Sequence, residues 1–412
     1  MDTIESRIDD KYQYNHGVLP QMTSEEESRQ LFVKSLKLHL AMKVAPGNKL
    51  SYQQRSAPAY EKRHKQAPQD YHQVREAMQD DPFFIFWSAM QRNSQEMMWR
   101  SVQVSVERDY PKIKQSARAT ASAGGTLALN PDLEIPRYHK AVDIHCMPGG
   151  YHSEFTPDDL ANGAVYDRAV WLYAMGRMGP FNDDIGLTTI DFVKQNYPNL
   201  KPKRILDMGC TVGHSTVPYC DAFPDAEIYA IDVAAPVLRY AHARAESLGK
   251  QIHFSQQNAE ETDFPDGHFD LIVSHILVHE TSNKAIRRIM AEAQRLLKPG
   301  GIVVHAETPP YKAMPDAFDA FILDWDTRNN NEPYWAGSHE LDPQQVAEET
   351  GFGRAAAFEA NQPSAFEQAE AARTKVFQGG DFGGGGYWYI WGAEKTSTEM
   401  PEIPASTLKE TA

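Results

Sequence analysis

The chain has 412 residues, of which 41% are hydrophobic and 24% are charged, and its formal net charge is −15. A chain of this length and apolar content builds two or three folded domains and is not disordered throughout. Its charge is uneven: residues 1–150 hold 20 Lys and Arg against 18 Asp and Glu, whereas residues 151–412 hold 21 against 38. Because so acidic a C-terminal part repels phosphate backbones, we expect no nucleic-acid partner.

The three cysteines, Cys146, Cys210 and Cys220, are an odd number and indicate no disulfide framework. The start of the chain lacks the apolar segment of a secretory signal peptide, and no apolar run approaches the roughly 20 residues that a bilayer crossing needs. We therefore expect a cytoplasmic protein with no membrane span.

The first third of the chain favours helices. One is expected over residues 24–44, ending at the helix-breaking pair Pro46–Gly47. Asp81 is a good N-cap and Pro82 suits the first helical position, so a second helix is expected to begin there. Its apolar side chains recur at steps of three, four and seven: Phe83, Trp87, Met90, Met97, Met98, Val102 and Val106. Such a stripe is typical of helix packing, with a cofactor or lipid groove as the alternative.

Beyond residue 160 the pattern changes to alternating helices and strands. Helices are expected over residues 162–180 and 185–196. Short apolar runs bounded by turn residues are typical of buried parallel strands. They occur at residues 204–208, 228–231, 252–255, 269–274 and 302–305, with later candidates at 354–360 and 386–391. This alternation predicts an α/β fold with a doubly wound, seven-stranded, mostly parallel sheet.

These patterns divide the chain into three parts. A mainly helical region over residues 1–150, which includes a linker-like stretch at 115–135, is expected to form a homodimer, to cap a pocket, or both. The α/β domain is expected over residues 151–395, with an insertion on its substrate side at residues 311–339. Residues 396–412 are rich in Pro, Thr and Glu, and we expect them to be disordered.

A glycine turn follows the first of these strands, in the sequence RILDMGCTVGHST. The strand carries the acidic Asp207, Gly209 allows the backbone to approach a ligand, and Gly213 lets helix and strand pack closely. The second strand ends in Asp232, about 20 residues further on, where a carboxylate accepts hydrogen bonds from ribose hydroxyls. Together these residues indicate a nucleoside-binding site.

This succession of strands and turns resembles the class I S-adenosylmethionine-dependent methyltransferases, well over residues 200–306 and in outline over 307–395. The resemblance implies S-adenosylmethionine as the cofactor. The loop that would surround its methionine part consists of Asp207, Gly209, Cys210, Thr211 and Gly213. At the other end the implied contacts are Asp232 with the ribose, Val233 with the adenine face, and Asn258, Ala259 and Glu260 at the adenine edge. Ser274 and His275 would end the fourth strand facing the sulfonium.

Thr211 stands where this family often has a third glycine. A turn that cradles phosphate is harder to build with a side chain there. The loop therefore favours a nucleoside over NAD, whose pyrophosphate needs a close approach of the backbone. An α/β fold without a bound cofactor is the alternative.

The candidate catalytic residues are His275, His279 and Glu280, which follow the fourth strand where the reacting ends are expected to meet. Methyl transfer is an in-line attack on a carbon activated by positive sulfur, so an enzyme mainly orients a nucleophile, excludes water and removes a proton. Histidine suits proton transfer near neutral pH. The alternative is that His279 and Glu280 only anchor the next helix. Because no carboxylate stands at Ser274 or His275, we expect no magnesium site.

A second group, His145, Cys146 and His152, has side chains that bind borderline or soft metals. Adjacent side chains in an extended segment point to opposite sides, however, and no Cys-x-x-Cys pair accompanies them, so we expect no metal there. A glycine turn that joins the helical region to the α/β domain is the simpler interpretation. A more specific hypothesis is that Tyr151 and His152 fold over the cofactor as a lid, together with Tyr166.

The insertion at 311–339 interleaves aromatic and polar side chains, as small-ligand pockets do, and Trp325 and Trp335 are its candidate substrate contacts. Packing of these aromatic residues onto the sheet is the alternative. The sequence thus predicts a metal-independent S-adenosylmethionine-dependent methyltransferase with a small-molecule acceptor. Two other classes stay open: a non-methylating enzyme such as a cyclase on the same fold, and a binding or scaffold protein whose helical region recognises a partner.

Overall fold

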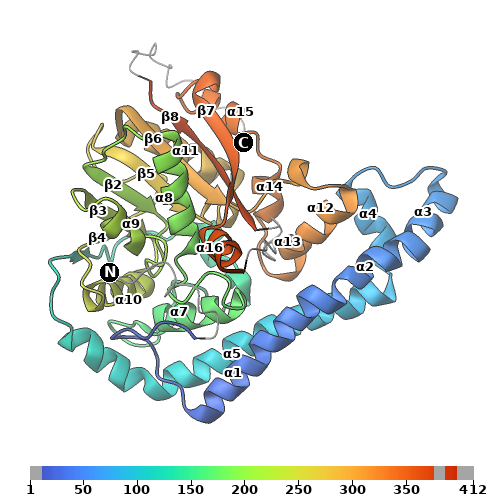
Figure 1. Ribbon diagram of the computed structural model, residues 1–412, viewed down its shortest axis with the longest axis horizontal. Helices are drawn as coiled ribbons and strands as arrows, with labels where there is room; N and C mark the ends of the chain where they lie inside the picture. The colour runs from blue at the N-terminus through green and yellow to red at the C-terminus, as the bar shows by residue number, and fades with distance from the viewer. Residues whose placement is uncertain (1–11, 375–385, 397–412) are drawn as a thin grey trace.

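A computed structural model describes residues 12–374 and 386–396 of the chain. Its centre is a sheet of eight strands in the order β1-β4-β3-β2-β5-β6-β8-β7 (Figure 1). The strands are β1 (Thr126–Ala128), β2 (Arg204–Met208), β3 (Glu227–Asp232), β4 (His253–Gln256), β5 (Phe269–His275), β6 (Leu297–Glu307), β7 (Ala357–Pro363) and β8 (Tyr387–Glu394). All but the two pairings that involve β8 are parallel, which confirms the mostly parallel sheet expected from the sequence. The tail expected at 396–412 lies outside the described residues except for Thr396.

The eighth strand, β1, comes from the stretch that the sequence suggested was a linker. Thr126 pairs in parallel with His253 at the edge of the sheet. A three-residue strand is too short to show a period, so its pattern gave no signal. Gly125 makes the pairing possible, because a Cβ there would lie 2.6 Å from the carbonyl oxygen of Ile252.

Helices cover both faces of the sheet, as expected of a doubly wound fold. One face carries α8 (Asp184–Asn196), α9 (Val217–Ala222) and α10 (Ala235–Ser247), and the other carries α11 (Asn283–Leu296) and α15 (Pro343–Glu349). Alternation along the strands divides the core in two. In β2, for example, Ile205 packs with the first group of helices and Leu206 with the second.

The N-terminal helices form a long hairpin along one side of the α/β domain (Figure 1). One arm contains α1 (Ser24–His39), α2 (Pro46–Ser51) and α3 (Ala57–His64), and the other is the 38-residue helix α5 (Pro82–Ala119). Asp81 caps α5 as predicted, since its side chain accepts hydrogen bonds from the backbone N–H groups of Phe83 and Phe84.

The predicted helix end at Pro46–Gly47 is wrong. The chain makes a π-helical turn, η2 (Leu40–Val44), and Pro46 then takes the first position of α2. Proline is tolerated at that position because the N–H it lacks would have no helical partner. The helical arm therefore continues outward instead of stopping.

The hairpin packs on the α/β domain in two places. Near its base, Met98 and Val102 of α5 lie in one apolar cluster with Ala164 and Leu172 of α7 (Ala161–Tyr173). Near its tip, α4 (Tyr71–Met78) packs against the insertion, whose helices are α12 (Ala317–Leu323), α13 (Trp325–Asn329) and α14 (Trp335–His339). The insertion thus lies between the sheet and the N-terminal helices. In the described ranges, no helix has both the length and the apolar character of a membrane span.

Candidate active site

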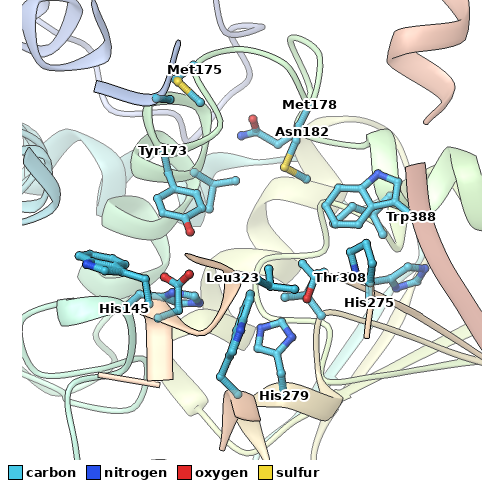
Figure 2. A pocket seen from close by; sticks show the side chains of 18 of the residues that line it. His145, Tyr173, Met175, Met178, Asn182, His275, His279, Thr308, Leu323 and Trp388 are labelled. Carbon is cyan, nitrogen blue, oxygen red and sulfur yellow. The ribbon is translucent and has the colours of Figure 1, made fainter. Parts of the chain in front are cut away.

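A cavity of about 810 Å³ lies at the carboxyl ends of the central strands, enclosed between the sheet, the helical hairpin and the insertion. Its floor comes from the glycine loop after β2 and from the segment after β5. Its walls come from α5, α7 and the insertion, including Trp87, Trp99, Tyr173, Trp325 and Trp335. Figure 2 shows His145, His275 and His279 along one side of it, opposite Met175 and Met178.

The glycine loop has the tight geometry that its sequence suggested. Gly209 and Gly213 have φ values of 76° and 75°, in the left-handed region that glycine adopts without strain, and Thr211 shares this region at 47°. A Cβ at position 209 would lie 2.6 Å from Cδ1 of Leu277. Of the predicted loop residues, Asp207, Gly209, Cys210 and Thr211 line the cavity.

Asp232 ties this loop to the neighbouring strand. Its Oδ2 accepts a hydrogen bond from the backbone N–H of Thr211 at 3.0 Å, and its Oδ1 accepts one from Ala234 at 2.9 Å. Burial raises the pKa of Asp232 to about 6, although these backbone hydrogen bonds act in the opposite direction. An oxygen that accepts a single backbone hydrogen bond keeps a lone pair for a ribose hydroxyl.

The residues predicted at the adenine end form a separate group beyond the tip of β3, and they do not line the described cavity: Val233, Asn258, Ala259 and Glu260. Asn258 Oδ1 accepts a hydrogen bond from the backbone N–H of Glu260, which fixes the turn after β4. The Glu260 carboxylate accepts hydrogen bonds from Tyr138 and Arg288 at 2.9 and 3.1 Å. Tyr138 thus reaches this turn from the segment before the α/β domain.

Asp207 is engaged within the protein. Thr216 Oγ1 donates a hydrogen bond to its Oδ2 at 2.5 Å, and His275 Nδ1 lies 3.1 Å from its Oδ1. His275 Nε2 lies 3.2 Å from the hydroxyl of Tyr219. Asp207 therefore holds the loop and His275 in place, and both nitrogens of His275 already have protein partners.

Ser274 and Gly213, also predicted at the cofactor, do not line the described cavity. Ser274 is fully buried, and its hydroxyl lies 2.6 Å from Nδ1 of His305 on the neighbouring strand. Its side chain therefore points into the core of the sheet.

The structure brings together histidines and glutamates that are far apart in the sequence. His145 Nε2 lies 2.9 Å from Glu280 Oε1, and His145 Nδ1 lies 2.8 Å from Glu332 Oε1. His279 Nδ1 lies 2.6 Å from Glu307 Oε2. Burial alone lowers the pKa of His279, but the Glu307 carboxylate outweighs it and raises the pKa.

Sequence reasoning missed Glu307 and Glu332. Glu307 ends β6, so its position at the carboxyl edge of the sheet was a usable signal. Glu332 lies in the insertion, where no spacing rule applies. Asp326 of the insertion also lines the cavity, and burial raises its pKa to about 7.

The backbone at His145 and Cys146 is not the extended segment that the sequence argument assumed. It forms a 3-10 turn with φ values of 54° and 59° at these residues. The Cys146 thiol lies 3.6 Å from Oδ1 of Asn330, and neither Cys146 nor His152 lines the described cavity.

Of the predicted lid, Tyr166 lines the cavity, where its ring stacks on His214 with centroids 5.9 Å apart. Tyr151 packs edge-on against Tyr166 with centroids 5.4 Å apart, and its hydroxyl lies 3.4 Å from Glu280. His152 lies against His139 instead. Tyr151 is thus linked to the site by its contacts with Tyr166 and Glu280.

Trp325 and Trp335 were predicted either to contact the substrate or to pack the insertion onto the sheet. Each lines the cavity and is also buried. Trp325 Nε1 donates a hydrogen bond to Ser88 of α5 at 2.8 Å. The ring of Trp335 lies 4.8 Å from that of His279, between centroids.

Comparison with known proteins agrees with this geometry. Residues 205–301 match the model of a methyltransferase domain family. They include the glycine loop, Asp232 and the segment after β5. These residues belong to the class I S-adenosylmethionine-dependent methyltransferases.

Relatives of this methyltransferase domain are similar over the same part of the chain. A demethylmenaquinone methyltransferase of Thermus thermophilus is 33% identical over 109 residues, which are 26% of this chain and 49% of the relative. A ubiquinone/menaquinone biosynthesis C-methyltransferase UbiE of Pseudomonas savastanoi is 30% identical over 125 residues, 29% of this chain and 47% of the relative. The chain thus spans about half the length of these curated relatives.

Among solved structures, phosphoethanolamine N-methyltransferase 2 of Haemonchus contortus is similar at 17% identity and a TM-score of 0.40, covering 56% of this chain and 58% of that one. A geranyl diphosphate C-methyltransferase of Streptomyces coelicolor is similar at 14% identity and a TM-score of 0.37, covering 56% and 81%.

Proposed function

We propose that the chain is an S-adenosylmethionine-dependent methyltransferase that methylates a small molecule enclosed in the 810 Å³ cavity. One observation carries this proposal: the hydrogen bond from Thr211 N–H to Asp232 Oδ2. It joins the glycine loop to the acid at the tip of the next strand, while the loop itself faces the cavity. One named relative is a demethylmenaquinone methyltransferase and another is a ubiquinone/menaquinone biosynthesis C-methyltransferase, which supports a small-molecule acceptor.

The residues present fit this cofactor. Asp232 offers a carboxylate for the ribose hydroxyls, and Val233, Asn258, Ala259 and Glu260 lie at the next strand tips for the adenine. Gly209, Cys210, Thr211 and Gly213 form the bend for the methionine part. When bound, S-adenosylmethionine supplies a methyl group activated by its positively charged sulfur.

The chain's own contribution is to orient the acceptor and to exclude water. The cavity has the size range of small-molecule sites, roughly 300–1,000 Å³, and aromatic walls suited to an apolar or aromatic acceptor. His279 lines the cavity, and its Nε2 is buried without a hydrogen-bond partner among the described residues. Glu280 does not line the described cavity and lies behind His145, 2.9 Å from its Nε2. His275 is a positioning residue in this proposal, because its two nitrogens already contact Asp207 and Tyr219.

We also propose that the chain is cytoplasmic and forms a homodimer through the N-terminal helices. Two exposed aromatic side chains on the adjacent helices α1 and α5 support the dimer: Phe32 is 58% exposed and Phe86 is 54% exposed.

Calorimetry with S-adenosylmethionine tests the cofactor directly. We expect one molecule bound per chain, and Asp232→Ala should weaken binding at least tenfold. A wild-type protein that is folded by circular dichroism but binds no cofactor would contradict the proposal.

Labelled cofactor tests the reaction. We expect incubation with methyl-labelled S-adenosylmethionine and a metabolite extract to give a labelled product together with S-adenosylhomocysteine. Product formation without S-adenosylhomocysteine would instead indicate the cyclase-type alternative, and a stoichiometric protein partner without turnover would indicate a scaffold.

A further inference from the structure

His145, His279 and Glu332 meet at one side of the cavity, although they come from three separate segments. One ligand-type atom of each residue lies within 4.8 Å of the corresponding atoms of the other two. His145 and His279 both line the cavity, so a group bound between these three residues faces the proposed acceptor. We call them the His–Glu cluster.

Each histidine of the cluster has a carboxylate on its far nitrogen. Glu307 Oε2 lies 2.6 Å from His279 Nδ1, and Glu280 Oε1 lies 2.9 Å from His145 Nε2. Histidines that bind metals almost always donate their other N–H to such a partner, which fixes the ring and aims the remaining lone pair at the ion. The cluster contains this arrangement twice.

Two atoms that face the centre of the cluster lack hydrogen-bond partners, whereas His145 Nδ1 has one in Glu332 Oε1. His279 Nε2 and Glu332 Oε2 are both buried with no hydrogen bond among the described residues, and they lie 3.9 Å apart. His279 is 1% exposed and Glu332 is 2% exposed. Buried polar atoms are normally paired, so two unpaired atoms that converge on one point indicate a missing ligand.

Distances within the cluster suit a small cation. A tetrahedral zinc ion with bonds of about 2.0–2.2 Å places its ligand atoms about 3.4 Å apart. His145 Nδ1 lies 2.8 Å from Glu332 Oε1, and Glu332 Oε2 lies 3.9 Å from His279 Nε2. The three ligand atoms all lie within 4.8 Å of one another, so side-chain shifts of about 1 Å bring them to the spacing of a zinc site.

The backbone around the cluster has unfavourable conformations. His145 and Cys146 have φ values of 54° and 59°, and Asn331, beside Glu332, has φ 58°. Residues other than glycine adopt this region at a cost, and such conformations concentrate at functional sites. The turn at His145 and Cys146 thus lies next to the contact between His145 and Glu332.

We propose that His145 Nδ1, His279 Nε2 and the Glu332 carboxylate bind one divalent transition-metal ion of the zinc class, with Glu280 and Glu307 as the carboxylates behind the two histidines. Two histidines and one carboxylate leave a coordination position open, as in catalytic metal sites. That position faces the cavity, where an acceptor oxygen, nitrogen or sulfur can occupy it.

Binding of an acceptor atom at the open coordination position rests on the proposed methyltransferase function, whereas the metal site itself does not. The site departs from the sequence-based expectation of a metal-independent enzyme. The competing account is a network in which His145 is a permanently protonated imidazolium between Glu280 and Glu332, and metal binding distinguishes the two.

Cobalt is the probe, because Co²⁺ occupies zinc sites and its visible absorption reports tetrahedral or five-coordinate ligands. The full chain, stripped of metal with a chelator, is titrated with Co²⁺ and then with Zn²⁺. We expect one Co²⁺ per chain, visible bands of a low-coordinate site, and displacement by one equivalent of Zn²⁺.

Variants assign the ligands. We expect His279→Gln and Glu332→Gln to lose the cobalt bands and to weaken binding at least 100-fold. Glu307→Gln should weaken binding about 10- to 100-fold, as loss of a supporting carboxylate does. His268→Gln, which removes a histidine far from the cavity, should bind as wild type does.

S-adenosylhomocysteine affinity, measured on the same proteins, separates this test from the proposed function. We expect it to be unchanged in His279→Gln and Glu332→Gln, which also shows that they are folded. A wild-type chain without stoichiometric cobalt bands would overturn the metal site, and so would equal cobalt binding by wild type and both ligand variants. A wild-type protein that binds cobalt but does not bind S-adenosylhomocysteine would overturn the methyltransferase proposal and leave the metal site standing.

Discussion

The Asp167 carboxylate lies 2.8 Å from Nε2 of His214, the residue directly after the glycine loop. The same carboxylate contacts Gln13 and His16 from the segment before α1, and it accepts a hydrogen bond from Tyr240 of α10, each at 2.8 Å. One buried acid thus joins the start of the described chain, the loop region and a sheet-covering helix. It connects Gln13 and His16 to the glycine-loop side of the domain.

Replacement of Asp167 by alanine is expected to destabilise the fold. It leaves His16, His214 and Tyr240 without their shared partner, so the free energy of unfolding should fall by about 3–5 kcal/mol. Urea denaturation at pH 7 measures this loss. Asp225→Ala, at an exposed acid 3.8 Å from Lys203, is the control and should change stability by less than about 0.5 kcal/mol. Equal effects of the two variants would argue against the role of Asp167.

The contribution of Asp167 should depend on pH only in acid. Burial raises its pKa, but His16 and His214 outweigh burial and hold the pKa well below its usual value. A depressed folded-state pKa means that the stabilisation is present above the unfolded pKa of about 3.9 and is lost as pH falls through the folded value. The stabilisation by the Asp167 carboxylate should therefore still be present at pH 5 and be lost as the pH falls below about 4, which urea denaturation of wild type and Asp167→Ala at each pH measures.

Cofactor affinity should decrease below about pH 6. Burial raises the pKa of Asp232 to about 6, and only the ionised carboxylate offers both oxygens as acceptors. We expect the dissociation constant of S-adenosylhomocysteine to rise up to about tenfold per pH unit below this value. Calorimetry between pH 5 and 8 measures it, with Asp232→Asn as the variant that should lose the pH dependence. A flat wild-type profile would contradict the assigned role of Asp232.

Alanine at Gly209 should damage the loop more than a positive φ alone explains. The added Cβ would lie 2.6 Å from Leu277, in addition to the backbone cost of about 1–2 kcal/mol for a left-handed residue. Gly249→Ala is matched, because Gly249 has φ 68° and open space around its Cβ position. We expect both variants to lose stability, but only Gly209→Ala to lose cofactor affinity, by tenfold or more. Similar affinities in the two variants would show that the close approach at Gly209 does not matter.

The proposed dimer is tested by sedimentation. Phe32 and Phe86 lie on adjacent helices and are more than half exposed. A glutamate at each should convert a dimer to a monomer without loss of helical content. Phe155→Glu, at a 65% exposed residue outside the hairpin, is the control and should leave the dimer intact. A wild-type protein that sediments as a monomer at micromolar concentration would contradict the proposal.

The parts of the fold that sequence predicted are those with a local signal. The five central strands are apolar runs with clear ends, and the prediction for β2, Arg204–Met208, matches the structure at both ends. Asp81 and Pro82 marked the start of α5 because capping is a local interaction. The helix end predicted at Pro46 was wrong, because the effect of this proline on the helix depends on the π-helical turn before it.

Only part of the candidate site could be predicted from local sequence signals. The glycine loop and Asp232 have a fixed separation in the chain, so their pattern predicts their proximity. The approach of His145 to Glu280 and Glu332 depends on how the insertion and the residues before the α/β domain pack together. No rule of spacing relates residues that meet only through tertiary packing.

The cavity has walls from three parts of the chain, and only its floor lies within residues 205–301. If the proposed function holds, donor recognition and acceptor selection are encoded in different stretches of sequence. Exchange of the hairpin and the insertion between homologous chains should change what is methylated while the donor stays the same. Relatives that are similar only over residues 205–301 therefore indicate the methyl donor, whereas the residues of the cavity walls determine the acceptor.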